Sequence, residues 1–141
     1  MVRVTFALVV GIGLGAGGLI AARHDEKQHG AIKVLAAPDI VEKVDGKEAK
    51  ATAVELTLEA GQAGDPHRHP GPVFGYVLEG EYEWAIDDQP AKVLKVGETF
   101  YEPTGSLHRV SKNPGKVKTR VLAWVVHPRD AKAVAIPEPK K

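Results

Sequence analysis

Two histidines separated by a single residue are the chain's clearest candidates for chemistry. They are His67 and His69, with Arg68 between them. Residues two apart in a β-strand point to the same face, about 7 Å apart along the backbone, so both imidazoles would lie on one side. A third histidine, His108, follows the tight-turn sequence at residues 103–105, which fixes the direction of its side chain. We expect these three imidazoles to bind one metal ion.

The ligand chemistry limits which ion this site would hold. A single histidine is more simply explained as a core or surface residue with ordinary hydrogen bonds, but three at these spacings favour a metal. The chain contains no cysteine, which excludes disulfides, thiolate metal sites, iron–sulfur clusters and thiol nucleophiles. Nitrogen ligands, with or without a carboxylate, suit divalent Fe, Mn, Ni, Cu, Co or Zn. We therefore expect one divalent transition metal and leave its identity open.

The elements that position these histidines are predicted to be strands. After Pro38 the sequence consists of short apolar runs with period two, separated by turn residues every eight to twelve positions. This pattern is typical of an all-β sandwich or barrel. We expect a β-barrel over residues 39–128 and a C-terminal tail over 129–141. A short helix could begin around residues 131–135, before Pro137 ends it.

The N-terminus has the layout of an export signal. Arg3 is followed by an uncharged apolar run over residues 4–22, which predicts a signal peptide over 1–22 and a periplasmic or secreted protein. An uncleaved membrane anchor is the alternative, although five glycines in the run weaken a spanning helix. Residues 23–38 are polar and mixed, which predicts a linker. A G-x-G-x-x-G string at residues 13–18 lacks the βαβ pattern of a nucleotide site.

Length and charge limit the number of domains and the kinds of partner that we expect. A chain of 141 residues is long enough for one domain with a core and too short for two of ordinary size. Its 19 basic and 18 acidic residues are mixed along the sequence, without a basic stripe that could follow a phosphate backbone. We expect no nucleic-acid partner, and no stable membrane association once the signal is cleaved.

The spacing of glycines, proline and histidines resembles the cupin family over about residues 54–126. The first cupin motif is a glycine, an H-x-H pair and a closing glycine, here Gly61, His67, His69 and Gly80. The second motif is a glycine, Pro-x-Gly and a histidine, here Gly97, Pro103, Gly105 and His108. The resemblance is to small, single-domain, quercetinase-like members. It implies a jelly-roll barrel, or double-stranded β-helix, with the metal ligands in the barrel mouth.

One family ligand is missing from the first motif. The position where the family has a glutamate is occupied by Val73. This leaves three interpretations: a three-histidine site, a fourth ligand from elsewhere, or a metal-free barrel that kept its histidines. The resemblance places Glu102 inward, like Phe100, and an inward carboxylate is costly unless it is paired or binds a cation. Glu102 is our candidate fourth ligand or general base; a buried structural pair or an outward, solvated side chain are the alternatives.

The resemblance also implies a pocket above the metal. Its candidate wall residues are aromatic side chains, each of which core packing would also explain: Phe74, Tyr82, Trp84, Phe100 and Trp124. We expect a dioxygenase-like oxidoreductase acting on a small organic substrate, with Glu102 accepting the substrate proton. The alternative is a non-catalytic cupin that binds a small molecule or metal. We also expect a homodimer that pairs through terminal strands.

Overall fold

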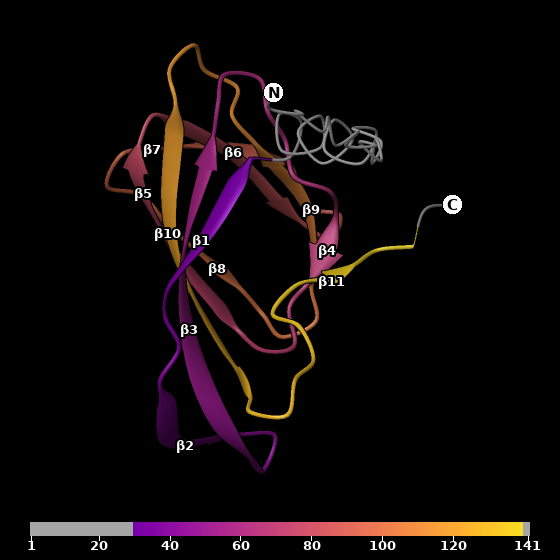
Figure 1. Ribbon diagram of the computed structural model, residues 1–141. Coiled ribbons are helices and arrows are strands. Elements are labelled where there is room, and N and C mark those ends of the chain that lie inside the picture. The colour runs from indigo at the N-terminus through magenta and orange to yellow at the C-terminus, as the bar shows by residue number, and fades with distance from the viewer. Residues whose placement is uncertain (1–29, 140–141) are drawn as a thin grey trace, which may run out of the picture.

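The computed structural model describes residues 30–139, which form two antiparallel β-sheets facing each other as the layers of a flattened barrel (Figure 1). The six-stranded sheet has the order β1-β3-β10-β5-β8, with β2 also paired to β3, and the five-stranded sheet has the order β11-β4-β9-β6-β7. The expected all-β jelly roll is confirmed. The strands are β1 (Ala31–Ala36), β2 (Asp39–Val44), β3 (Lys47–Leu58), β4 (His67–Arg68), β5 (Val73–Glu79), β6 (Glu81–Ile86), β7 (Lys92–Lys95), β8 (Thr99–Glu102), β9 (Leu107–Lys112), β10 (Thr119–Pro128) and β11 (Ile136–Pro137).

A two-residue turn starts the longest strand of the sheet. Asp45 and Gly46 have φ angles of 50° and 74°, and they join Val44 of β2 to Lys47 of β3. Two positive φ angles in succession make a turn whose twist matches that of a hairpin, and Asp-Gly is one of the few pairs that adopts it easily. The turn therefore sets the register from which β3 runs on between β1 and β10.

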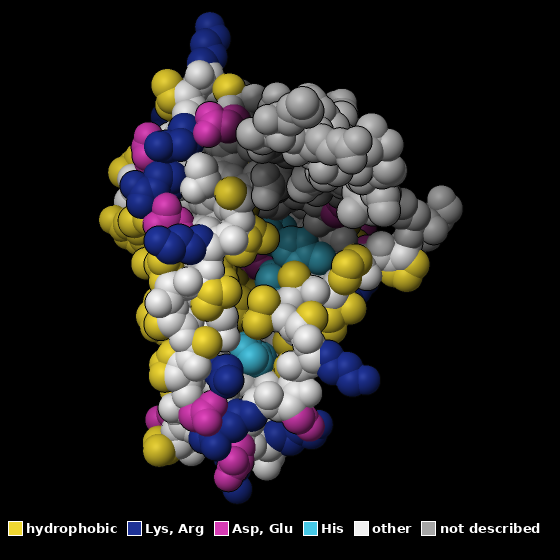
Figure 2. Space-filling view, in the orientation of Figure 1, with side chains coloured by type: hydrophobic (Ala, Val, Ile, Leu, Met, Phe, Trp, Pro, Cys, Tyr) yellow, Lys and Arg dark blue, Asp and Glu magenta, His cyan; other side chains and the backbone are white. Residues whose placement is uncertain are grey.

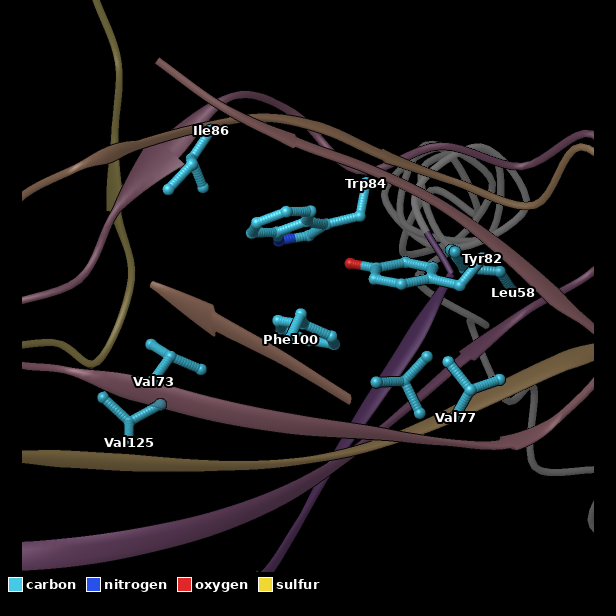
Figure 3. Packing of buried hydrophobic residues seen from close by; sticks show 9 residues of the cluster. Leu58, Val73, Val77, Tyr82, Trp84, Ile86, Phe100 and Val125 are labelled. Atoms are coloured by element: carbon cyan, nitrogen blue, oxygen red, sulfur yellow. The ribbon is translucent and has the colours of Figure 1, made fainter. Parts of the chain in front are cut away.

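The core lies between the two sheets and follows the period-two alternation of the strands. On β5, Val73 and Val77 are buried, while Phe74 and Tyr76 between them are exposed. Tyr82 and Trp84 of β6 face these valines from the opposite sheet (Figure 3). The full buried cluster consists of apolar and aromatic side chains from both sheets: Leu58, Val73, Val77, Tyr82, Trp84, Ile86, Phe100, Val121 and Val125.

The sheet begins earlier than the sequence pattern suggested. Strand β1 lies inside the range 23–38 that we interpreted as a linker, and it pairs with β3 from Ala31 opposite Thr57. The open edge of β3 offers unpaired N–H and C=O groups, which an extended segment rich in Ile, Val and Leu can satisfy. The predicted signal segment lies outside the described residues. Within residues 30–139, no helix is long and apolar enough to cross a membrane.

The C-terminal tail forms no helix, so the expectation for residues 131–135 is wrong. Its main chain bonds to the barrel instead of to itself: β11 pairs with β4, and the Glu138 N–H donates to the Pro66 carbonyl at 3.0 Å. A single helical turn in so short a segment contributes little stability, so pairing with the open strand edge is the more stable arrangement. The tail thereby runs along the segment that carries His67 and His69.

Candidate metal centre

Strand pairing brings the two histidine motifs together. Strands β4 and β9 are neighbours in the five-stranded sheet, with His67 directly opposite His108, and His69 follows at the end of β4. The ring centroid of His67 lies 4.7 Å from that of His69 and 4.9 Å from that of His108. The structure thus gathers the three sequence-predicted histidines at one end of the barrel.

A glycine turn locks the two motifs to each other. Gly105 has a φ of 74°, a left-handed conformation that side chains other than glycine rarely adopt. Its N–H donates to the His69 carbonyl at 3.0 Å, and its own carbonyl accepts from Arg68 Nη1 at 2.8 Å. The loop before His108 is therefore fixed to the segment that carries the other two histidines.

Backbone carbonyls determine which nitrogens of His67 and His69 carry hydrogen. His67 Nδ1 lies 2.8 Å from the Asp65 carbonyl, and His69 Nδ1 lies 2.5 Å from the Val134 carbonyl. Carbonyl oxygens only accept hydrogen bonds, so both Nδ1 atoms must donate. In the neutral rings, both Nε2 lone pairs then face each other across 3.0 Å. Two facing lone pairs repel unless a cation lies between them or next to both.

A buried carboxylate lies beside these nitrogens. Glu102 is 1% exposed, its Oε1 accepts a hydrogen bond from Trp84 Nε1 at 3.0 Å, and its Oε2 lies 3.6 Å from His69 Nε2. Oε1 also lies 3.2 Å from His108 Nδ1. Glu102 Oε2 and His108 Nδ1 are buried without any hydrogen-bond partner. The outward, solvated position for Glu102 is therefore excluded. The two buried polar atoms without a partner are available to bind a ligand.

Burial keeps His69 and His108 neutral. It lowers the pKa of His69 to about 4, against the opposing hydrogen bond to Val134, and it lowers the pKa of His108 to about 3 with help from the neighbouring histidines. Burial also raises the pKa of Glu102 to about 7, although the Trp84 hydrogen bond opposes the shift. Neutral imidazoles are the form that binds metal ions.

The donor set fits a divalent transition metal. One nitrogen from each of His67, His69 and His108 lies within 4.8 Å of the others. Two nitrogens bound at about 2.1 Å to one ion, at a right angle, would be about 3.0 Å apart, which is the separation of the two facing Nε2 atoms. These three histidines could hold the ion, and the free oxygen of Glu102 is placed to join them.

An apolar cavity of about 220 Å³ adjoins the histidines and Glu102. Histidine side chains are visible in the hollowed middle of the face drawn in Figure 2, bordered by hydrophobic ones. The wall is mainly aliphatic, with contributions from both the sheet and the tail, and no lysine or arginine of residues 30–139 belongs to it. Its aliphatic members on β3 and β10 include Val54, Leu56, Val121, Ala123 and Val125.

The aromatic residues expected in the pocket divide into three groups. Tyr82 and Phe100 line the cavity. Trp84 lies behind Phe100, with ring centroids 5.6 Å apart, and acts on the site only by its hydrogen bond to Glu102. Phe74 and Trp124 are 52% and 39% exposed on the outer face of the six-stranded sheet, so placing them in the pocket was wrong. Strand alternation turns them outward because their neighbours Val73 and Val125 face in.

Several site residues gave no recognisable signal in the sequence. Val134 supplies the carbonyl that orients His69, and it lines the cavity together with Ala135. Ser111 bonds Tyr82 at 2.8 Å, and the Tyr82 hydroxyl lies 3.4 Å from His108 Nε2. For Arg68 the sequence did offer a signal. Strand alternation indicates that the residue between two inward histidines points outward, and in the structure Arg68 points toward the tail.

Known structures share this fold. A conserved protein with a double-stranded β-helix domain from Klebsiella pneumoniae subsp. pneumoniae MGH 78578 is 21% identical, covers 82% of this chain and 94% of its own, and has a TM-score of 0.59. A DMSP lyase, DddQ, from Ruegeria pomeroyi DSS-3 is 19% identical over 90% of this chain and 58% of its own, with a TM-score of 0.58. At these identities the likeness shows the fold alone.

Sequence comparison supplies the family. A search of curated protein sequences finds no match. The family model for the cupin domain matches residues 54–125, a range that holds the three histidines, Glu102 and strands β5 to β9. The match covers more than half of the chain and spans both histidine motifs. The chain belongs to the cupin family.

Proposed function

We propose that this protein is an exported, metal-dependent oxidoreductase of the dioxygenase type, acting on a small organic substrate. The observation that carries the proposal is the pair of facing Nε2 atoms of His67 and His69, because in the neutral rings the two lone pairs face each other and a cation next to both would stabilise them. The apolar cavity beside them supplies a place for a substrate, and Glu102 supplies a buried polar group between the two.

The chain's own residues would bind and orient the substrate. The aliphatic wall excludes water and accepts an apolar body, and Tyr82 and Phe100 offer aromatic faces. Because no described lysine or arginine lines the cavity, a substrate oxygen has no side-chain cation to meet there. Glu102 Oε2 is free to accept the proton that a substrate hydroxyl loses, while Trp84 holds the other oxygen in place.

A bound redox-active ion would supply the electron path between substrate and dioxygen. In a dioxygenation both oxygen atoms enter the substrate, so the substrate is the only reductant and no further cofactor is needed. A cavity of about 220 Å³ limits the substrate to a small molecule. Small phenols and diketones are suitable probes, because a phenol and the enol form of a diketone each combine an apolar body with an acidic hydroxyl.

Metal analysis of the purified protein tests the site. We expect about one redox-active ion per chain, lost in His67→Ala and weakened in Glu102→Gln. A matched control is His127→Gln, since His127 is also buried but bonds Thr52, away from the cluster. Equal metal in the wild type and His67→Ala would overturn the proposed centre.

Oxygen uptake with the probe panel then separates enzyme from binding protein. Substrate-dependent uptake that requires the metal and falls in Glu102→Gln supports the oxidoreductase. Tight binding of a probe without uptake supports the second candidate, a non-catalytic cupin that holds a small molecule or metal. Export is tested separately, by N-terminal sequencing of the chain recovered from outside the cytoplasm, where a start near residue 23 is expected.

A further inference from the structure

Gly75 interrupts the row of inward side chains on β5. Its neighbours Phe74 and Tyr76 point outward, and the next inward positions along the strand, Val73 and Val77, carry buried valines. Alternation would therefore direct a side chain at position 75 into the barrel, where the strand has none. The φ angle of Gly75 lies outside the left-handed region, so the backbone conformation does not require a glycine here.

The ring of Phe100 occupies the space that a side chain at position 75 would need. Phe100 lies on β8, directly opposite Gly75 in the register. A Cβ atom on Gly75 would come closer than 3.0 Å to three ring atoms of Phe100, which are Cζ, Cε1 and Cε2. The far end of the ring thus rests against the main chain of β5. Phe100 lines the cavity there, whereas Gly75 does not.

Two further aromatic rings hold Phe100 against β5. The ring centroid of Phe100 lies 5.6 Å from that of Tyr82 and 5.6 Å from that of Trp84. Figure 3 shows the Phe100 ring between these two side chains and the strand that carries Val73 and Val77. Both aromatic neighbours are buried, and close-packed interiors contain few voids into which a ring could move. A ring displaced from Gly75 would therefore move into the cavity.

The same row of the sheet extends beneath the cavity. Ala123 on β10 is opposite Gly75, and Val54 on β3 is opposite Ala123; both of these line the cavity. Glu102 lies two residues from Phe100 on the same face of β8, about 7 Å along the strand. A ligand whose hydroxyl group meets Glu102 would thus reach the row of Phe100 and Ala123 at its other end.

We propose that Gly75 and Phe100 set the size of the ligand, by keeping the phenyl ring down and leaving space for one ring that bears an acidic hydroxyl. This inference rests on the proposed function, because it concerns the ligand of the same cavity. A dry apolar cavity of about 150 Å³ holds one benzene ring, so ten ring carbons would need about 250 Å³ at the same packing. The cavity of about 220 Å³ accommodates one ring with its hydroxyl but not two fused rings.

Calorimetry on the metal-free protein, with phenol as the probe, tests the role of the glycine. Gly75→Ala pushes the Phe100 ring into the cavity, so we expect the phenol dissociation constant to rise at least tenfold. The double variant Gly75→Ala/Phe100→Leu removes the ring atoms that the new methyl group meets, and should bring this constant back to within threefold of wild type. Gly115→Ala is the matched control, because it adds a methyl group outside the cavity, 3.3 Å from its nearest neighbour.

Phe100→Leu tests the size limit from the opposite direction and decides it even where Gly75→Ala alone does not fold. We expect the wild type to bind phenol at least tenfold more tightly than 2-naphthol, and Phe100→Leu to bind 2-naphthol at least tenfold more tightly than the wild type does. Unchanged phenol binding in folded Gly75→Ala, or unchanged 2-naphthol binding in Phe100→Leu, overturns the inference. The expected ranking without bound metal or oxygen uptake would overturn the proposed function alone.

Discussion

Arg68 and Glu138 form a two-point ion pair that fastens the end of the chain to the histidine strand. Arg68 Nε and Nη2 donate to the two oxygens of Glu138 at 2.9 and 3.3 Å. Arg68 stands between His67 and His69, and Glu138 lies just after the segment whose Val134 carbonyl orients His69. The pair thus acts on the site indirectly, by holding the tail that fixes a tautomer.

Releasing this pair should weaken metal binding more than it weakens the fold. Both side chains are more than a third exposed, so the pair itself contributes at most about 1 kcal/mol to stability. Loss of the carbonyl that orients a histidine ligand typically costs about tenfold or more in metal affinity. We expect Glu138→Gln to raise the metal dissociation constant about tenfold, measured by chelator competition, and to speed hydrogen exchange in the tail.

Glu48→Gln is the control for that experiment, because it makes the same change in another arginine pair of the chain. Glu48 accepts from Arg129 at 2.9 Å, and neither residue contacts the histidines. Its metal affinity should equal that of the wild type. If Glu138→Gln speeds exchange in the tail while metal affinity stays constant, the tail does not position His69.

The second prediction concerns the hydrogen bond from Trp84 to Glu102. Trp84→Phe keeps an aromatic ring against Phe100 but removes the indole N–H that donates to Oε1 of Glu102. This bond lowers the pKa of the Glu102 carboxyl against the effect of burial, so its removal should raise that pKa further above about 7 in the metal-free protein. Carboxyl ¹³C shifts followed across pH measure the change. A pKa that stays the same or falls would show that Trp84 does not bond Glu102 in solution.

The metal-free protein should also show a characteristic pH dependence of stability. His69 and His108 have a pKa of about 4 and about 3 when folded, below the ordinary 6.5, so the unfolded chain binds protons that the folded one does not. Their contribution to stability is lost as pH falls below about 6.5. Glu102 acts oppositely, because its folded pKa of about 7 exceeds the ordinary 4.5. Its contribution is lost as pH rises from about 4.5 to 7.

Glu102→Gln separates these two effects. The glutamine carries no charge, so at pH 8 the metal-free variant should unfold with a free energy higher than wild type by up to ~3 kcal/mol. At pH 4 the glutamate is protonated in the folded state and mostly protonated in the unfolded state, so the difference should nearly vanish. Denaturant titrations at both pH values measure it, with Glu42→Gln, on exposed β2, as the control. Higher stability without metal together with weaker metal binding would mark Glu102 as a functional residue.

The sequence patterns predicted the barrel well, for a physical reason. Alternation of apolar residues and turn pairs such as Asp45-Gly46 are local signals, and they determine strands and hairpins directly. The H-x-H spacing predicted that His67 and His69 share a face, and the turn at Gly105 precedes His108, which pairs opposite His67.

The errors concern contacts between distant segments. Which face of a strand turns inward depends on its register with neighbours, so Phe74 and Trp124 were assigned to the pocket although they lie outside. The return of the tail to β4 depends on an open strand edge and on one arginine, and two residues of pairing leave no periodic signal. The carbonyl of Val134 could not be found at all, since every residue has one.

The final prediction tests the cavity independently of the metal. Ala123 on β10 faces inward, lines the cavity and contacts neither the histidines nor Glu102 through any hydrogen bond. Ala123→Leu places three further carbon atoms in the space that a ligand would occupy. We expect about one metal ion per chain as in the wild type, a change in unfolding free energy of less than ~2 kcal/mol, and at least tenfold weaker binding of the phenol or diketone probe, measured by calorimetry. Leu122→Ile, on the outer side of the same strand, is the control and should bind the probe normally. Unchanged probe affinity in Ala123→Leu would mean that the ligand binds elsewhere, even if the metal centre is correct.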